Sequence, residues 1–99
     1  MLIVTGIITI TDGDLDKARP AIAQMVAETL KEPGCITYDF WVHHSEPTRL
    51  RVYEEWQDRA ALDAHAASAH MGVFRAALGQ LGPMTRDLVT IEAGDVKPL

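Results

Sequence analysis

The chain begins with a run of apolar and β-branched residues in which every second position belongs to one face. Residues 2–11 carry no charge on either set of alternate positions. β-Branched residues with a period of two favour a β-strand. Because neither face of this strand is charged, we expect a sheet covered on both sides, by helices of its own chain and by another subunit.

The next segment, residues 12–34, has apolar side chains at helical spacing and predicts the first helix. Asp12 or Asp14 is the expected N-cap, and the pair at 33–34, Pro-Gly, ends the helix. Pro20 removes one backbone hydrogen bond, so either the first turns bend or the main helix starts near it.

The remaining pattern predicts a hairpin, a second helical segment and a last strand. Residues 35–44 and 48–56 are strand-like and flank a short polar loop with a proline, which favours an antiparallel hairpin. Residues 57–82 are helical, with Asp58 as the first cap and Ser68 as a second cap after a break. Residues 84–93 predict the fourth strand.

The predicted order of elements is β-α-β-β-α-β within a single domain, residues 1–99, of which residues 94–99 form a loose tail. Right-handed crossovers put both helices on one face of a four-stranded antiparallel sheet, which is the ferredoxin-like arrangement of an α+β protein. The other face stays bare. We therefore expect a homodimer in which a second copy covers that face, sheet against sheet.

Composition narrows the classes of partner. Fourteen acidic against nine basic residues give a formal charge of −5, which disfavours nucleic acid as a partner. The apolar start is too short to span a bilayer and has no basic residue before it, so neither a membrane anchor nor a signal peptide is expected. Cys35 is the single cysteine and cannot form an internal disulfide, which favours a reducing, cytoplasmic location.

Several residues, in this order and spacing, carry a resemblance to a known family. They are Pro33, Gly34, Cys35, Tyr38, Glu54, Trp56, Leu62, His65, Ser68, His70 and Met71. With them the chain resembles, over nearly its whole length, the antibiotic biosynthesis monooxygenase domain family, whose members are small dimeric α+β barrel proteins and include quinol monooxygenases.

The resemblance implies oxidation of phenolic or quinol-type substrates by molecular oxygen, without metal or flavin, in a pocket between the sheet and its helices. Haem-degrading relatives are implied to have a tryptophan at the position of His65 and a histidine at that of Arg75, so haem degradation is disfavoured. Because one fold supports many chemistries, the reaction is less well indicated than the family.

His65 and His70 are the candidate catalytic bases, since an imidazole titrates near neutral pH. They lie five positions apart, which in one unbroken helix turns the two rings away from each other. A break at Ala67-Ser68 would let both rings point toward one pocket. In the alternative interpretation His70 satisfies backbone groups at the break, and His65 lies on a partly exposed helix flank.

Six other residues are candidates for binding the substrate, and each also has a structural interpretation. Trp56 provides a flat aromatic surface on which a substrate can stack, or it fills the core. Met71 and Phe74 line the pocket or belong to the core. Gly6 leaves space under the helices for a pocket floor, or only for a bulky neighbour. Tyr38 and Arg86 carry donors suited to a phenolate, although strand parity leaves their direction open.

No metal site or other cofactor is expected. His43 and His44 are predicted at a hairpin tip, where adjacent residues face opposite ways and are solvated. A catalytic zinc or iron site needs three convergent ligands, and the sequence has no motif that supplies them. Cys35 is interpreted as a small buried residue rather than a reactive thiol.

The leading hypothesis is thus a cofactor-independent monooxygenase acting on a small aromatic or quinol-like compound. An isomerase that uses the same histidines to shuttle protons without oxygen is the alternative among enzymes. A non-catalytic dimeric binder of hydrophobic metabolites is the alternative from another class. Oxygen uptake separates the first hypothesis from the other two, and anaerobic product formation identifies the isomerase.

Overall fold

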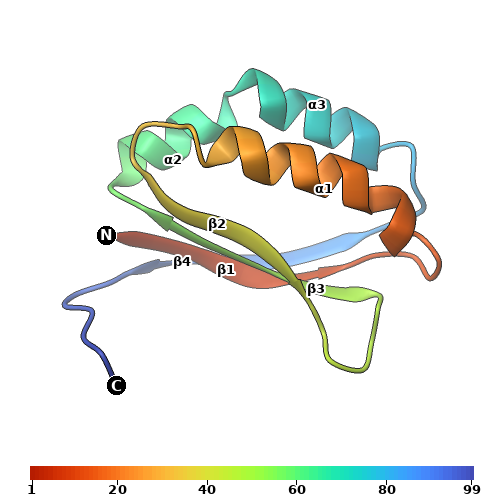
Figure 1. Cartoon of the computed structure of the whole chain (residues 1–99), viewed down its shortest axis with the longest axis horizontal. Helices are drawn as coiled ribbons and strands as arrows, with labels where there is room; N and C mark the ends of the chain where they lie inside the picture. Colours follow the sequence, from red (N-terminus) through yellow and green to blue (C-terminus); the bar gives the residue numbers. More distant parts are fainter.

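A four-stranded antiparallel sheet carries three helices on one face in the computed structural model, which describes residues 1–99 (Figure 1). The strands are β1 (Leu2–Thr9), β2 (Cys35–Val42), β3 (Arg49–Trp56) and β4 (Thr85–Glu92). The helices are α1 (Leu15–Thr29), α2 (Arg59–Ala66) and α3 (Ala69–Leu78). Residues 93–99 follow β4 without regular secondary structure.

The strand order is β2-β3-β1-β4, which confirms the predicted ferredoxin-like sheet. β1 is central and pairs antiparallel with both β3 and β4. Even-numbered residues of β1, β3 and β4 share one face of the sheet because the register pairs even with even positions, for example Val4 with Glu54 and Thr90. This shared face is the one that faces the helices. This common parity brings the inward side chains of several strands together beneath the helices.

The first helix starts at Leu15, with Asp14 as the N-cap residue, and runs through Pro20 to Thr29. Of the two alternatives for Pro20, a helix that starts near it is therefore wrong, and the helix includes the proline. The proline costs one bond to the carbonyl of Asp16, and since both residues are exposed, water can satisfy that carbonyl. The Asp14 carboxylate does not cap its own helix but accepts a hydrogen bond from the Gly82 backbone at 2.8 Å.

The predicted second helical segment is divided into α2 and α3 at Ala67 and Ser68. Both predicted caps are confirmed: the Asp58 carboxylate accepts from the Ala61 amide at 2.9 Å, and the Ser68 hydroxyl accepts from the Met71 amide at 3.3 Å. The same hydroxyl donates to the carbonyl of His65 at 2.7 Å. Ser68 thus fixes the end of one helix against the start of the next.

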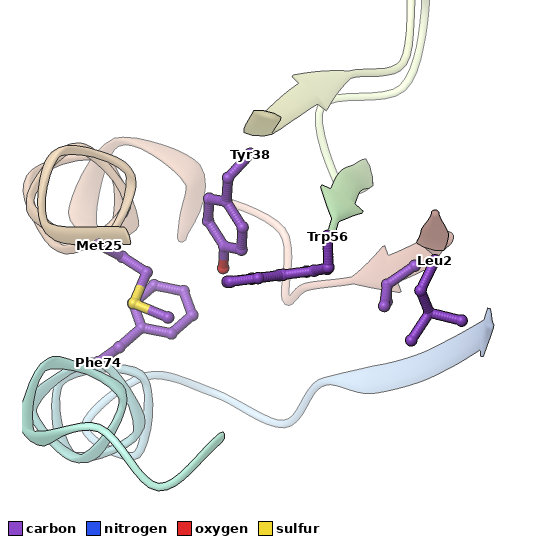
Figure 2. Packing of buried hydrophobic residues seen from close by; sticks show 6 residues of the cluster. Leu2, Met25, Tyr38, Trp56 and Phe74 are labelled. Atoms are coloured by element: carbon purple, nitrogen blue, oxygen red, sulfur yellow. The ribbon is translucent and has the colours of Figure 1, made fainter. Parts of the chain in front are cut away.

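The core lies between the sheet and the helices and contains the fully buried Trp56, with Met25 at 1% exposure. In Figure 2, Met25 of α1 and Phe74 of α3 point toward Tyr38 and Trp56 of the sheet. A second group of buried aliphatic side chains, at the other end of β1, contains Ile8, Ile10, Leu50 and Val52.

Gly6 is required by the sheet itself. A Cβ atom at this position would collide with the backbone of Asp87 and Leu88 in the neighbouring strand β4. The absent side chain is therefore replaced by a close approach of backbone rather than by open space under the helices.

No helix lies on the other face of the sheet (Figure 1). This face is partly apolar. Trp41 is 61% exposed there, and Val89 and Ile91 are 54% and 46% exposed. Strand β4 is exposed along its whole length, including Leu88 on the helix side.

The three helices are too short or too polar to span a bilayer.

The Thr29 hydroxyl has no hydrogen-bond partner in the protein. Because the residue is completely inaccessible to solvent, water does not satisfy this group either. Replacing Thr29 by Val keeps the shape of the side chain and removes the unsatisfied group. We expect Thr29→Val to raise the free energy of unfolding by about 1 kcal/mol. Urea denaturation measures the change, and Thr29→Ser is the control that retains the hydroxyl. A loss of stability in Thr29→Val would mean that the hydroxyl has a partner in solution.

Candidate functional site

A small cavity lies between the inward face of the sheet and helix α3, with a volume of about 80 Å³. Its polar lining comes from Tyr38 of β2, Glu54 of β3, Arg75 of α3 and Arg86 of β4. The remaining lining is apolar and consists of Ile8, Phe40, Val52, Met71, Phe74, Leu78, Met84 and Leu88. One acidic group, one phenol and two guanidinium groups therefore meet in an otherwise apolar hollow.

Glu54 is the buried carboxyl group of this cavity. It occupies an inward position of β3, between Val52 and Trp56, and is only 6% exposed. Burial raises its pKa to about 7; the hydrogen bond from Trp56 opposes the rise, and the charge of Glu32 adds to it. That hydrogen bond joins the indole Nε1 to the Glu54 Oε1 at 2.8 Å. Glu54 can therefore both accept and release a proton near neutral pH.

Tyr38 lies beside Glu54 and faces the helices. Burial, together with the charge of Glu54, raises the pKa of its phenol well above the usual range. The hydroxyl consequently stays protonated and can act only as a neutral hydrogen-bond partner. The Tyr38 ring also contacts the imidazole of His65, with ring centroids 5.3 Å apart.

Arg75 and Arg86 bring positive charge to the cavity. Both residues are exposed overall, and neither forms an ion pair with a carboxylate. Since a guanidinium group has several donors in one plane, the two side chains are suited to hold an anion such as a phenolate. The open question about strand parity is thereby answered: Arg86 and Tyr38 line the same cavity.

The two predicted histidines meet at a third residue, Glu32, which lies in the turn between α1 and β2. The Nδ1 atom of His65 is 2.7 Å from the Glu32 Oε2, and the Nε2 atom of His70 is 3.0 Å from the same oxygen. His65 is 3% exposed, whereas the side chains of His70 and Glu32 are 17% and 14% exposed. The break before α3 therefore brings the two imidazoles together, but at Glu32 rather than in the pocket that the sequence interpretation expected.

Neither imidazole lines the cavity. His65 lies behind its wall, packed against Tyr38 and, with ring centroids 4.7 Å apart, against Trp56. Glu54 provides the carboxyl group that lines the cavity. The geometry therefore favours Glu54, rather than a histidine, as the titratable group that contacts a ligand there. The alternative of an exposed His65 on a helix flank is wrong, because the ring is buried.

The other substrate-binding candidates divide between the cavity and the core. Met71 and Phe74 line the cavity, and Phe74 is also part of the core. Trp56 is fully buried and does not line it, so its place is the core and its indole positions Glu54. Gly6 does not form the floor, because the backbone of β4 fills the position of its missing side chain.

The sequence pointed to Glu54 only as part of the family resemblance, and neither Glu54 nor Glu32 was assigned a place in the site. Glu54 could have been found from strand parity, since Leu50, Val52 and Trp56 share its face and an acidic residue among them must be buried. Glu32 gave no comparable signal, because its approach to two histidines more than thirty positions away depends on tertiary structure.

His43 and His44 stack on each other in the β2–β3 loop, with ring centroids 4.5 Å apart, far along the chain from the other pair. The Nδ1 atom of His43 accepts from the Ser45 amide at 3.2 Å. Cys35 is half-buried, and burial together with the charges of Glu32 and Glu54 raises the pKa of its thiol to about 11. Its thiol is therefore protonated at neutral pH and poorly nucleophilic.

The cavity is small for a substrate. A volume of about 80 Å³ is well below the roughly 150 Å³ that accommodates a benzene-sized ring. Its lining includes Met71, an unbranched side chain with several rotatable bonds, and two arginines that are exposed overall.

Comparison with known proteins gives a consistent result. Residues 1–77 match the family model described as antibiotic biosynthesis monooxygenase. A Mycobacterium tuberculosis protein named "Putative monooxygenase Rv0793" is 33% identical over 63 residues, which cover 64% of this chain and 61% of that protein. An uncharacterized Synechocystis protein, sll1783, is 36% identical over 55 residues, or 54% of this chain and 37% of its own. The matches thus span less than two thirds of these relatives.

Solved structures share the fold. A crystal structure described as an antibiotic biosynthesis monooxygenase is similar with a TM-score of 0.86 and 30% identity, covering 96% of this chain and all (100%) of the other. A Deinococcus radiodurans structure described with the same family name has a TM-score of 0.88 at 23% identity, covering 100% of this chain and 98% of the other.

Proposed function

Since the chain belongs to the antibiotic biosynthesis monooxygenase family, we propose that it is a cofactor-independent monooxygenase that oxidises a small phenolic or quinol-type aromatic with molecular oxygen. The observation that carries this proposal is the buried Glu54, whose pKa is raised to about 7 in a cavity shared with two arginines. A base and an anion-binding group in one apolar hollow are what the formation of a phenolate requires.

The proposed reaction converts a phenol and one molecule of oxygen into a quinone and one molecule of water. One oxygen atom replaces the ring hydrogen opposite the hydroxyl group and becomes a carbonyl. The other oxygen atom leaves as water with that hydrogen and with the hydroxyl hydrogen. The substrate supplies all four electrons that reduce the oxygen molecule, so no external reductant enters the balance.

Glu54 is the proposed base, and it replaces the histidines in that role. Its carboxylate accepts the hydroxyl proton, which leaves an electron-rich anion that can transfer an electron to oxygen. Arg75 and Arg86 hold the anion, and the protonated Tyr38 donates a further hydrogen bond to it. Proton transfer by a positioned group contributes roughly 10²–10⁴-fold to a rate.

His65 and His70 act in this proposal as positioning residues. Packing of His65 against Tyr38 and Trp56 holds the two side chains that flank Glu54. The hydrogen bonds to Glu32 hold His65 in turn. Loss of the imidazole should therefore lower activity by disordering Tyr38 and Trp56 rather than by removing the base.

Oxygen consumption tests the proposal. The protein is mixed with a panel of phenols and naphthols that carry a hydrogen opposite the hydroxyl group, and oxygen uptake is followed with an electrode while the quinone is followed by absorbance. We expect enzyme-dependent uptake with one molecule of oxygen consumed for each quinone formed from a phenol. Product that forms equally well without oxygen would indicate an isomerase, and saturable binding without turnover would indicate a binder.

We also propose that the working form is a homodimer joined through the uncovered face of the sheet. That face carries Trp41, Val89 and Ile91, each 46% exposed or more, and every residue of β4 is exposed. A small domain leaves much apolar surface exposed unless a partner covers it, and burial stabilises by about 25 cal/mol per Å². A second copy of the chain presents the same face and can cover it.

Replacing Trp41 by Glu should convert the dimer to a monomer, because a charge then replaces the largest exposed apolar side chain of the proposed interface. Light scattering at micromolar concentration measures the mass, which should fall by about half relative to the unmodified protein. Val73→Glu is the matched control, since Val73 is 52% exposed on helix α3, away from the sheet face. A protein that is monomeric before any substitution would contradict the proposal.

A further inference from the structure

Three metal-ligating side chains converge on one point outside the cavity. They are Glu32, His65 and His70, whose donor atoms all lie within 4.8 Å of one another. The two imidazole nitrogens approach the same carboxylate oxygen, at 2.7 Å and 3.0 Å. Nitrogen and oxygen donors around a tetrahedral Zn²⁺ are separated by about 3.3 Å. The two nitrogen–oxygen distances therefore need to open by only a few tenths of an ångström to admit an ion. The two imidazole nitrogens lie within 4.8 Å of each other and need to reach the same spacing.

The group is held by three separate elements. Glu32 lies in the turn between α1 and β2, His65 lies in the last turn of α2, and His70 is the second residue of α3. Ser68 fixes the angle between α2 and α3 through its bonds to the His65 carbonyl and the Met71 amide. The backbone amide of Glu32 is bonded to the Thr29 carbonyl at 3.0 Å. Two histidines and a carboxylate are thus presented together before any ion is bound.

The charge around the group favours a cation. Glu32 forms ion pairs with no lysine or arginine, and its only partners are the two imidazoles. Its uncompensated charge contributes to the raised pKa values of both Tyr38 and Glu54. Neighbouring Lys31, which could have neutralised it, is paired with Glu28 instead. A bound cation would relieve this negative potential.

We propose that Glu32, His65 and His70 form a binding site for a divalent first-row transition-metal ion such as Zn²⁺, with water as the fourth ligand. Two histidines and one glutamate with an open position are a frequent ligand set for this class of ion. Partial exposure of His70 and Glu32 gives the ion and its water a path to the site. The ion would tie the α1–β2 turn to both later helices, independently of the proposed oxidation.

Zn²⁺ titration of the chelator-treated protein tests the site. We expect calorimetry to show one ion bound per chain. The affinity should fall at least about tenfold in both Glu32→Gln and His70→Ala, because even the loss of a residue that only hydrogen-bonds to a metal ligand costs roughly tenfold or more in metal affinity. Glu32→Gln preserves hydrogen bonding to the imidazoles and so tests the ligand role without removing the contact. His43→Ala and His44→Ala are the matched controls and should bind Zn²⁺ as the unmodified protein does.

Co²⁺ provides a second readout that does not depend on the variants folding. The unmodified protein with one equivalent of Co²⁺ should develop the visible absorption bands of a protein-bound ion, and Zn²⁺ should displace them. The proposal is overturned if no saturable binding occurs, if Glu32→Gln binds as tightly as the unmodified protein, or if only the His43 and His44 variants lose binding. Oxygen uptake in the absence of metal leaves the proposed reaction intact whichever of these results is found.

Discussion

Glu54→Gln is expected to reduce kcat/KM for a phenolic substrate by about 10²–10⁴-fold, the range that a positioned proton acceptor contributes. The amide has nearly the shape of the carboxyl group and can still accept the hydrogen bond from Trp56, but it cannot take the substrate proton. Initial rates of quinone formation measure the effect. Glu55→Gln is the control, because Glu55 is the next residue along β3 and is bonded to the Tyr53 hydroxyl at 2.6 Å.

The activity of the unmodified protein should depend on pH through the protonation of Glu54. Burial raises the pKa of Glu54 to about 7, so the carboxylate required as a base is depleted below that pH. The value of kcat/KM should therefore rise as pH increases through about 7 and level off above it. A Glu54→Gln protein that keeps the unmodified rate, or a Glu55→Gln protein that loses as much, would remove Glu54 from the role of base.

Trp56→Ala is expected to lower the free energy of unfolding by about 3–5 kcal/mol, which is the usual cost of truncating a buried aromatic side chain to alanine. Trp56 is fully buried at the centre of the core beside Tyr38 (Figure 2). Its removal also leaves the buried Glu54 without its hydrogen-bond donor. Such a loss is a large fraction of the total stability of a small domain. Urea unfolding followed by circular dichroism measures it.

Trp56→Phe separates the packing of this residue from its hydrogen bond. The phenyl ring retains much of the buried apolar contact, so the loss of stability should be smaller than in Trp56→Ala. The indole N–H lowers the pKa of Glu54, so without it the rise of kcat/KM should move to a pH above 7. A loss below 1 kcal/mol in Trp56→Ala would show that Trp56 is not a core residue in solution.

The order and type of the elements could be predicted because each has a local signal. The alternation in β1, the caps Asp58 and Ser68, and the turn at Gly34, where φ is +84°, all depend on near neighbours in the chain. The break between α2 and α3 followed from the position of Ser68. The start of α1 was less predictable, because the cost of Pro20 depends on whether the carbonyl that it leaves free is exposed to water.

The site was predictable only in part, because the convergence of its residues is long-range. Tyr38 and Arg86 have the expected chemistry, yet only the strand register places both on the cavity side. The sequence singled out the two histidines, but their common contact with Glu32 joins residues that no local pattern connects. The sequence has no motif with three convergent metal ligands, which argued against a metal site. The contact with Glu32 adds a third donor to the two histidines, as the proposed ion site requires.

A carbon-13 NMR titration of the glutamate side-chain carboxyl groups tests whether Glu54 can be the base, with the Glu54 signal assigned by its absence from Glu54→Gln. We expect this signal to titrate with a midpoint at about pH 7, because the group is buried in the cavity. A midpoint near 4.5, the ordinary value for the side chain, would mean that Glu54 is solvated and cannot be the base at the centre of the proposed site.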